Sequence, residues 1–228
     1  MQIASSQMAE KKRRRIPIRL GEGCEDHPGE LLLLREMAHR INNELTSTIS
    51  VVTCTALRST NREVKVALSE VIEHLHDHAR VYRALQIPTA DRWIDAGGYL
   101  RELCQSISRA RLRHRGIELV LIDNPLQLSA SQCWRLGLIV AELITNASRH
   151  AFANGGGVIR IELKRHGCFA ECRVTDDGVG PEKIRPGQGL GIMRQLAEGL
   201  DGKFEQCFGK RGAVATVSFP IAEPLRGD

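Results

Sequence analysis

The sequence lacks long apolar runs and regularly paired cysteines. No apolar stretch approaches the roughly 18 to 20 residues of a membrane-spanning helix, and the basic start is not followed by the apolar segment of a secretory signal. These absences exclude a membrane span and secretion, and they predict a cytoplasmic location. The seven cysteines form an odd set without C-x-x-C spacing, so neither a disulfide framework nor a zinc site is indicated. We expect reduced, mostly buried thiols.

The sequence also lacks a surplus of charge over most of its length. Its net charge of +5 is carried by the first 20 residues, which hold six basic residues and one acidic residue. A phosphate-reading surface needs its Lys and Arg surplus on the folded body, so a nucleic-acid-binding core is excluded. Residues 1–28 are expected to form a basic, disordered leader. A contact between Lys11–Arg15 and an anionic membrane or nucleic acid stays open.

Apolar residues recur at alternating steps of four and three in two stretches between residues 29 and 88. The first set is Leu34, Ala38, Ile41, Leu45, Thr48 and Val52, and the second is Val64, Leu68, Val71, Leu75, His78, Tyr82 and Leu85. This period is typical of helices that bury a narrow seam, and the break at Ser59–Asn61 predicts an antiparallel hairpin. A lone hairpin exposes one flank of each seam, so we expect a homodimer joined through a four-helix bundle.

Residues 92–221 mix helical and strand patterns without an internal repeat. Ser129 is the expected N-cap of the longest helix of this region. The expected elements are helices at 96–113, 129–152 and 190–200 and strands at 117–122, 158–164, 169–175, 203–208 and 213–219. Irregular interleaving of this kind predicts an α/β sandwich with helices on one face of a mixed sheet. With the hairpin, the whole chain is of the α+β class.

Polar residues share one face of the helix expected at 129–152. Glu142 and Asn146 are four positions apart, and Arg149 or His150 follows after three or four more. An asparagine among core positions needs a partner, and a hydrated Mg²⁺ bound by one amide oxygen would serve. Taken alone, the same residues would be an ordinary polar helix flank.

Two glycine-rich stretches follow that helix. Asp176 stands at the end of an expected strand, where its carboxylate can accept a hydrogen bond from an exocyclic amine, and Gly178 and Gly180 let the backbone approach a flat ring. The run Gly187-Gln188-Gly189-Leu190-Gly191 opens a helix whose N–H groups favour phosphates. It is neither a dinucleotide fingerprint nor a P-loop, because the βαβ unit and the Lys-Ser/Thr pair are missing. Each stretch by itself would be an ordinary turn or loop.

In this order and at this separation, the three stretches resemble the N, G1 and G2 boxes of the GHKL (Bergerat-type) ATP-binding fold, shared by histidine kinases, gyrase-type ATPases and anti-sigma kinases. The resemblance covers about residues 92–221 and implies ATP and Mg²⁺ as ligands. It implies that Asn146 holds Mg²⁺, that Glu142 lies near the γ-phosphate and that Asp176 reads the adenine amine. Arg149 or His150 would approach the phosphates. The loop walls would be Gly178, Gly180, Gly187, Gly189, Leu190 and Gly191.

A histidine on the first expected helix points to one branch of that fold. The run His39-Arg40-Ile41-Asn42-Asn43 resembles the phosphoacceptor helix of the H-R-x-x-N class of sensor histidine kinases, which is related to the HWE kinases. His39 follows seam residue Ala38, so it should reach water, and an imidazole that titrates near neutrality is a competent nucleophile towards phosphorus. Arg40 stands where common histidine kinases have an acidic residue, which leaves Glu36 and Glu44 as candidates for the base.

The resemblance implies a two-component histidine kinase core in three parts. Residues 1–28 would be the leader, 29–88 the dimerisation and phosphotransfer hairpin, and 92–221 the ATP-binding catalytic domain. The γ-phosphoryl group would pass to His39 and then to an aspartate of a response regulator receiver domain. A separate sensor protein, or a part of the protein beyond this sequence, would supply the signal.

Two other functions stay open at this point. One is a phosphotransfer or scaffold protein whose hairpin relays phosphate without ATP. The other is a GHKL serine kinase of the anti-sigma type, whose phosphate would appear on a partner serine. A metal site at His74 and His78, one helical turn apart, is disfavoured because no third ligand is indicated.

Overall fold

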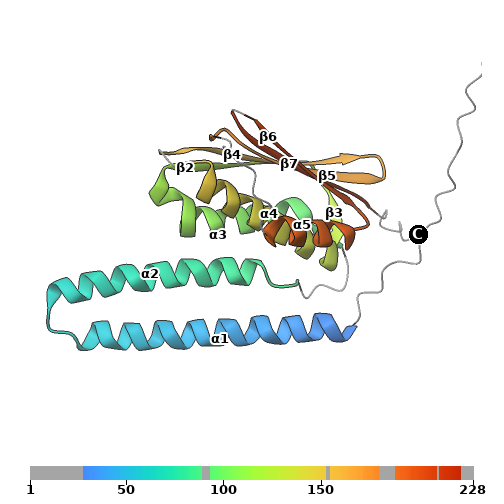
Figure 1. Ribbon diagram of the computed structural model, residues 1–228. Coiled ribbons are helices and arrows are strands. Elements are labelled where there is room, and N and C mark those ends of the chain that lie inside the picture. Colours follow the sequence, from blue (N-terminus) through green and yellow to red (C-terminus); the bar gives the residue numbers. More distant parts are fainter. Residues whose placement is uncertain (1–27, 89–92, 153–154, 180–187, 210, 222–228) are drawn as a thin grey trace, which may run out of the picture.

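A long helical hairpin is followed by an α/β domain whose helices cover one face of a sheet (Figure 1). The structure is a computed structural model that describes residues 28–88, 93–152, 155–179, 188–209 and 211–221. The predicted basic leader, apart from Pro28, lies outside the described residues. Within the described part of the chain, no helix has both the length and the apolar character that crossing a bilayer requires.

The hairpin consists of α1 (Pro28–Arg58) and α2 (Arg62–Ala84). Asn61 begins α2 as its N-cap, and its side-chain oxygen accepts a hydrogen bond of 2.8 Å from the backbone N–H of Glu63. The two helices pack side by side, and α2 also packs against the α/β domain, so that α2 lies between α1 and that domain (Figure 1). At the end of the hairpin, the Trp134 indole N–H donates to the carbonyl oxygen of Leu85 over 3.1 Å.

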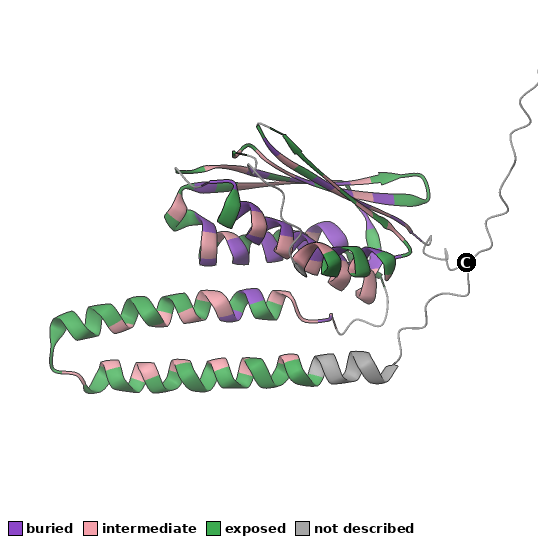
Figure 2. Cartoon of the chain, in the orientation of Figure 1, coloured by how far each residue is buried: buried purple, intermediate pink, exposed green. Residues whose placement is uncertain are grey.

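The seam between α1 and α2 agrees with the predicted one only in part, because Ala38, Leu45, Val52, Leu68 and Leu75 lie in it as predicted but other predicted members do not. The buried or half-buried residues that recur in steps of four and three are Ala38, Asn42, Leu45, Ile49, Val52 and Ala56 on α1 and Leu68, Ile72, Leu75 and Ala79 on α2. The predicted seam residues Ile41 and Val71 are instead 43% and 45% exposed. Apolar residues cover more of each helix than one helix–helix contact uses. A second apolar line therefore stays open in the single chain, and most of the hairpin surface is exposed (Figure 2).

The domain begins with a short strand and a helix that breaks before its predicted end. Strand β1 (Trp93–Asp95) pairs antiparallel with β3 (Gln127–Ser129), a pairing that the sequence pattern did not predict. Helix α3 (Ala96–Ile107) then gives way to a π-helical turn, η1 (Ser108–Leu112), and a 3₁₀ turn, η2 (Arg113–Arg115). The single helix predicted at 96–113 is thus three consecutive helical segments.

The main sheet has five strands in the order β2-β4-β5-β7-β6. Their bounds are β2 (Ile117–Asp123), β4 (Gly157–His166), β5 (Phe169–Asp176), β6 (Lys203–Gly209) and β7 (Gly212–Pro220). β2 and β4 are parallel because helix α4 (Ala130–His150) crosses between them, and the other pairs are antiparallel. Helix α5 (Gln188–Glu198) completes the helical layer. The predicted fold, a helical hairpin and a mixed-sheet α/β sandwich, is confirmed.

The core fills the space between the sheet and the helices that cover one of its faces. Its largest fully buried side chains come from α3, α4 and the central strands, and they include Leu100, Leu103, Ile139, Ile144, Ile161, Leu163 and Phe219. Burial of each such side chain stabilises the fold by about 1.5–3 kcal/mol.

The described cysteines are divided between the core and the surface. Cys104, Cys133 and Cys172 are buried, but the other described cysteines, Cys54, Cys168 and Cys207, are exposed. The expectation of mostly buried thiols is therefore wrong.

Candidate nucleotide-binding site

Helix α4 carries the first group of predicted site residues. Ser129 is its N-cap, as predicted, and forms a capping box with Gln132, because each accepts a hydrogen bond of 3.2 Å from the other's backbone N–H. Glu142 and Asn146 lie one turn apart and are half-buried. Arg149 and His150 occupy the last turn and are exposed.

Two arginines from the broken helix hold the C-terminal half of α4. Arg111 Nη1, in the π-helical turn, donates to Thr145 Oγ1 over 2.9 Å, directly beside Asn146. Arg115 donates to the backbone carbonyl oxygens of Ser148 and Phe152. Cationic groups at the carbonyl end of a helix complement its dipole. Sequence reasoning missed both residues; an arginine at every second position from 109 to 115 was the available signal.

The end of β5 forms the second part of the site. One oxygen of Asp176, Oδ1, accepts hydrogen bonds from the backbone N–H groups of Gly178 over 3.1 Å and Ala213 over 3.3 Å. Gly178 lies against the end of α4, where a Cβ atom would come within 2.4 Å of the carbonyl oxygen of Ala151. The N–H of Val179 donates to that same oxygen over 2.9 Å. Only glycine fits at position 178, and the loop is thereby fixed against α4.

Burial raises the pKa of the Asp176 carboxyl, and the backbone N–H groups of Gly178 and Ala213 act in the opposite direction. Within the described residues, no cation pairs with this half-buried carboxylate, and its second oxygen, Oδ2, accepts no hydrogen bond. A partly desolvated acceptor without a partner is disfavoured in the free protein. Such an oxygen can accept a hydrogen bond from a ligand amine.

Gly212, the first residue of β7, is a residue beside Asp176 that sequence reasoning missed. Its φ angle is +109°, and a Cβ atom there would lie 1.8 Å from the carbonyl oxygen of Asp176. A side chain at this position would therefore displace Asp176, so only glycine is compatible. A neighbouring contact also supports the loop, because Asp177 Oδ1 accepts the N–H of Val158 over 2.7 Å. The glycine after Arg211 was the signal in the sequence, but its contact with Asp176 is formed only in the folded chain.

The start of α5 meets the polar face of α4. A Cβ atom on Gly189 would lie 2.8 Å from Glu142 Oε1 and 3.8 Å from Asn146 Nδ2. Leu190 packs against the core, and Gly191 is exposed with no atom near its missing side chain. The structure thus brings together residues from the first and third predicted stretches. Gly180 and Gly187 lie outside the described residues.

His39 is not part of this cluster. It is exposed on α1, and α2 lies between α1 and the α/β domain (Figure 1). Its Nδ1 atom is 3.2 Å from Nδ2 of Asn43, one turn further along α1. Glu36, one of the two predicted candidates for the base, instead accepts a hydrogen bond from Arg40 Nε over 3.1 Å. In the described part of the chain no group of three or more His, Cys, Asp and Glu side chains could hold a metal ion, so His74 and His78 gain no third ligand there.

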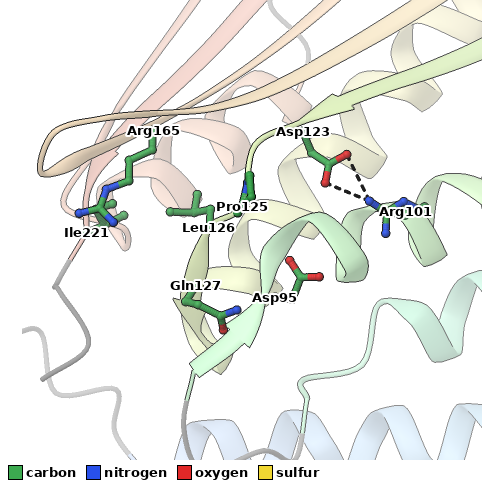
Figure 3. A pocket seen from close by; sticks show the side chains of 8 residues that line it. All are labelled: Asp95, Arg101, Asp123, Pro125, Leu126, Gln127, Arg165 and Ile221. Atoms are coloured by element: carbon green, nitrogen blue, oxygen red, sulfur yellow. Dashed lines mark hydrogen bonds and ion pairs between the residues drawn. The ribbon is translucent and has the colours of Figure 1, made fainter. Parts of the chain in front are cut away.

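A separate hollow of about 590 Å³ lies at the other end of β2 and β4 (Figure 3). Arg101 and Asp123 lie next to each other on one side of it and form an ion pair of 3.0 Å. The Asp123 carboxylate also lies against the start of α3, where a Cβ atom on Gly97 would be 2.0 Å from it. None of the predicted site residues lines this hollow. Its charged groups anchor the end of β2 to α3.

Two family profiles match the chain. The profile described as "Histidine kinase" matches residues 36–111, and the profile described as "Histidine kinase-like ATPase domain" matches residues 96–217, which is more than half of the chain. The chain belongs to the histidine kinase family. The predicted resemblance to sensor histidine kinases of the HWE-related class is confirmed, and the family's ATPase domain implies nucleotide binding.

Curated relatives agree with this assignment. The chain is 28% identical over 205 residues to "Blue-light-activated histidine kinase 2" of Erythrobacter litoralis. The matched region covers 83% of this chain and 57% of that relative. It is 27% identical over 197 residues to "Sensor histidine kinase PdtaS" of Mycobacterium tuberculosis, with 82% of this chain and 39% of the relative covered. The chain thus spans between about two fifths and three fifths of these relatives' length.

Solved structures share the fold. The histidine kinase domain of an Erythrobacter litoralis blue-light-activated histidine kinase has a TM-score of 0.56 and 23% identity, over 78% of this chain and 96% of that one. A bacterial phosphotransferase has a TM-score of 0.55 and 15% identity, over 83% of this chain and 94% of that one. At this identity the likeness concerns the fold.

Proposed function

We propose that this chain is the kinase core of a two-component system. It binds ATP at the convergence of α4, the end of β5 and the start of α5, transfers the γ-phosphoryl group to His39, and passes it to an aspartate of a response regulator receiver domain. The observation that carries the proposal is that Gly189 meets Glu142 and Asn146 in a chain whose hairpin presents an exposed histidine. The predicted domain bounds, 29–88 and 92–221, and the cytoplasmic location belong to the same proposal.

The residues around this convergence fit a purine nucleotide. Asp176 offers an oxygen without a partner in the described structure, which suits the exocyclic amine of adenine. The missing side chain of Gly189 leaves room beside Glu142 and Asn146 for phosphates. Arg149 and His150 stand exposed at the end of α4, where they can approach those phosphates. Gly178, Gly180, Gly187, Leu190 and Gly191 would form the walls of the loop.

The donor set also fits Mg²⁺, a cation that prefers oxygen ligands and keeps several waters. Asn146 would hold it through its amide oxygen, with Glu142 one turn away on the same face of α4. When bound, the ion neutralises phosphate charge during phosphoryl transfer. The protein's own part is to fix the donors, and the hydrogen bond from Arg111 to Thr145 does this for the turn that contains Asn146.

A homodimer is part of the proposal. Met37, Ile41, Val51 and Val71 are between 43% and 64% exposed and lie on the hairpin away from its own seam. Burial of about 100 Å² of apolar surface stabilises an interface by roughly 2.5 kcal/mol, so pairing of two hairpins in a four-helix bundle would cover this line favourably. Because α2 separates His39 from the nucleotide cluster, phosphorylation then requires movement of the α/β domain or use of the partner's domain.

The test is incubation with γ-labelled ATP and Mg²⁺, followed by measurement of acid-labile, base-stable label. Wild type should become labelled, whereas His39→Ala and Asn146→Ala should lose the label. His76→Ala is the matched control, because His76 is an exposed histidine on the other helix of the hairpin, and it should label like wild type. Label that persists in His39→Ala would refute the proposed acceptor.

A nucleotide-binding assay and the chemical stability of the label separate the other two functions. A protein that relays phosphate without ATP would fail to bind a fluorescent ATP analogue in the presence of Mg²⁺. A GHKL serine kinase would place acid-stable label on a partner and would be indifferent to His39→Ala. Transfer from labelled protein to a receiver domain, with loss of label from His39, would complete the proposed reaction.

A further inference from the structure

One stripe of α2 faces the α/β domain rather than the other helix of the hairpin. Val81 is 3% exposed and belongs to the core of the domain, and Leu85, four positions later, packs against that core. His78 lies three positions before Val81 and is half-buried, so it falls on the same stripe. The element that α2 meets there is the π-helical turn η1. An ionisable ring therefore stands at the contact between the hairpin and the domain.

Arg111 supplies a fixed positive charge on the domain's side of this contact. Its guanidinium donates to Thr145 Oγ1 over 2.9 Å, and this buried hydroxyl in turn donates to the carbonyl oxygen of Ala141 over 2.8 Å. Withdrawal of Arg111 from η1 would remove the donor from a buried oxygen, which costs free energy. Arg111 therefore keeps its place beside α2 when the charge of a neighbour changes.

The surroundings of His78 disfavour its protonated form. Burial of the ring lowers its pKa below the ordinary value of 6.5, and Arg111 and then His74 lower it further. Asp77 acts in the opposite direction, but its carboxylate is engaged by Arg80 on the same helix. His74 and Asp77 stay beside the ring wherever α2 goes, whereas Arg111 acts only while α2 lies against η1. Separation of α2 from η1 would therefore return the pKa of His78 towards its ordinary value.

We propose that His78 and Arg111 form a pH-sensitive latch, in which protonation of His78 releases α2 from the α/β domain. In the docked arrangement, with α2 against η1, the protonated ring and the guanidinium repel each other. Because Arg111 is anchored, α2 is the part that moves. The apolar contact that opposes this movement is small, since Ala79 and Val81 are the buried residues among those described in α2. A modest repulsion is therefore sufficient to shift the balance between docked and released chains.

The docked arrangement is fully favoured only above the pKa that His78 has after release, about 6.5. It loses stability as the pH falls through that value towards the lower pKa of the docked ring, and each unit between the two pKa values changes the equilibrium about tenfold. The hydrogen bond from Trp134 to Leu85 at the end of the hairpin provides a pivot for the movement. Release bears on the proposed function because α2 separates His39 from the nucleotide cluster (Figure 1). Acid should therefore favour transfer to His39, and this consequence rests on that function.

Exposure of the Val81 methyl groups measures the latch without kinase activity. In the whole chain with labelled methyl groups, a soluble paramagnetic agent should leave the Val81 signals, assigned through Val81→Ile, sharp at pH 7.5 and broaden them severalfold at pH 5.5. His78→Gln should stay shielded at both pH values, and His78→Lys should be exposed at both. His76→Gln is the matched control, because His76 is exposed and lies off the stripe, and it should respond like wild type. In Arg111→Gln, the ring of His78 should titrate at higher pH than in wild type.

Phosphorylation tests the consequence of release. Initial rates of labelling, quenched in alkali, compare wild type with His78→Gln at each pH, so that titration of His39 affects both proteins alike. The ratio of the wild-type rate to the variant rate should rise severalfold between pH 7.5 and pH 6.0, and a constant ratio would overturn the link to phosphorylation. Val81 signals that stay sharp in wild type at pH 5.5, or that broaden equally in His78→Gln, would overturn the latch. Absence of label on His39 in wild type at every pH would instead refute the proposed function and leave the Val81 result unaffected.

Discussion

The hairpin and the α/β domain differ in how much apolar surface each buries within a single chain. The domain has an apolar core in which Leu100, Ile139 and Ile161 are fully buried. In the described part of α1 and α2, by contrast, only Ala79 and Val81 are buried, and most of the hairpin surface is exposed (Figure 2). The hairpin of a single chain therefore buries far less apolar surface than the domain does. If two hairpins pair as proposed, the second surface adds the contacts that the single hairpin lacks.

The same substitution in the two regions gives the largest expected contrast. Ile161→Ala should lower the free energy of unfolding of the domain by about 2–5 kcal/mol, because it leaves a cavity in a close-packed core. Ile41→Ala removes the same atoms from an exposed position and should change that free energy by less than about 0.5 kcal/mol. Its effect should appear in the dimer, which should dissociate at higher protein concentration.

Denaturant titration of the domain signal and light scattering over a dilution series measure the two effects separately. Val71→Ala, on the facing helix, should repeat the behaviour of Ile41→Ala. A loss of several kcal/mol from Ile41→Ala in the single chain would mean that the two regions do not differ as described.

Glycines in the candidate nucleotide-binding site should differ in their effect on stability according to the atoms that lie beside them. Gly178→Ala places a methyl group 2.4 Å from the carbonyl oxygen of Ala151, so it should destabilise the domain by about 1–3 kcal/mol. Gly191→Ala meets no atom within 4 Å and lies in α5, so it should leave the free energy of unfolding unchanged or raise it by up to about 1 kcal/mol. Thermal denaturation without nucleotide compares the two variants. Equal losses would show that loop contacts at Gly178 do not support the fold.

Asp176 should favour ligand binding at the expense of the free protein's stability. Its folded-state pKa is raised by burial, so its contribution to stability is fully present below the unfolded pKa, about 3.9, and is lost as pH rises through the raised folded value. Asp176→Asn should therefore be as stable as wild type or more stable at neutral pH. Since the carboxylate is only half-buried, solvent screening keeps the gain below about 1 kcal/mol.

The same variant should lose the stabilisation that ATP gives to wild type. Melting temperatures with and without ATP and Mg²⁺, measured at pH 4.5 and pH 7.5, check both statements. Asp177→Asn is a neighbouring control whose Oδ1 can still accept the Val158 N–H. An unchanged ATP response in Asp176→Asn would remove the adenine role from this residue.

The smallest expected effect concerns a buried hydroxyl in the domain. Tyr99 Oη has no hydrogen-bond partner in the described structure, and burial raises the pKa of this phenol. Tyr99→Phe should therefore leave the free energy of unfolding unchanged or raise it by up to about 1 kcal/mol. Gly137→Ala should act in the opposite direction, because its methyl group would lie 2.4 Å from that hydroxyl. Urea denaturation of Tyr99→Phe and Gly137→Ala measures both free energies of unfolding. A clear loss in Tyr99→Phe would show that the Tyr99 hydroxyl makes a stabilising contact.

The sequence predicted elements better than contacts. Periodicity located both hairpin helices and every strand of the main sheet, and the N-cap at Ser129 follows from local chemistry alone. The hairpin seam was predicted in part, because Ala38, Leu45 and Val52 lie in it as expected. Periodicity could not show that Asn42 and Ile49, rather than Ile41 and Thr48, lie between them, since only packing decides this. Helix α3 gives way to a π-helical turn that contains Arg111, whose hydrogen bond to Thr145 on α4 is a tertiary contact that periodicity does not show.

In the candidate site, too, some residues could be predicted from the sequence and some contacts could not. Glu142, Asn146 and Asp176 follow from residue type and spacing, although their roles stay predictions. Gly212 is 36 residues from Asp176 along the chain, and its role exists only through the folding of β7 beside β5. Asn43 was visible as part of a motif, but its contact with His39 Nδ1 needed coordinates.

The most direct test of the account is to locate the phosphate after incubation with ATP and Mg²⁺. Peptides prepared at alkaline pH, which preserves phosphohistidine, should carry phosphate on His39 in wild type and on no residue in Asn146→Ala. Phosphate on a different residue of wild type, or undiminished phosphate on His39 in Asn146→Ala, would contradict the link between the nucleotide cluster and the hairpin histidine.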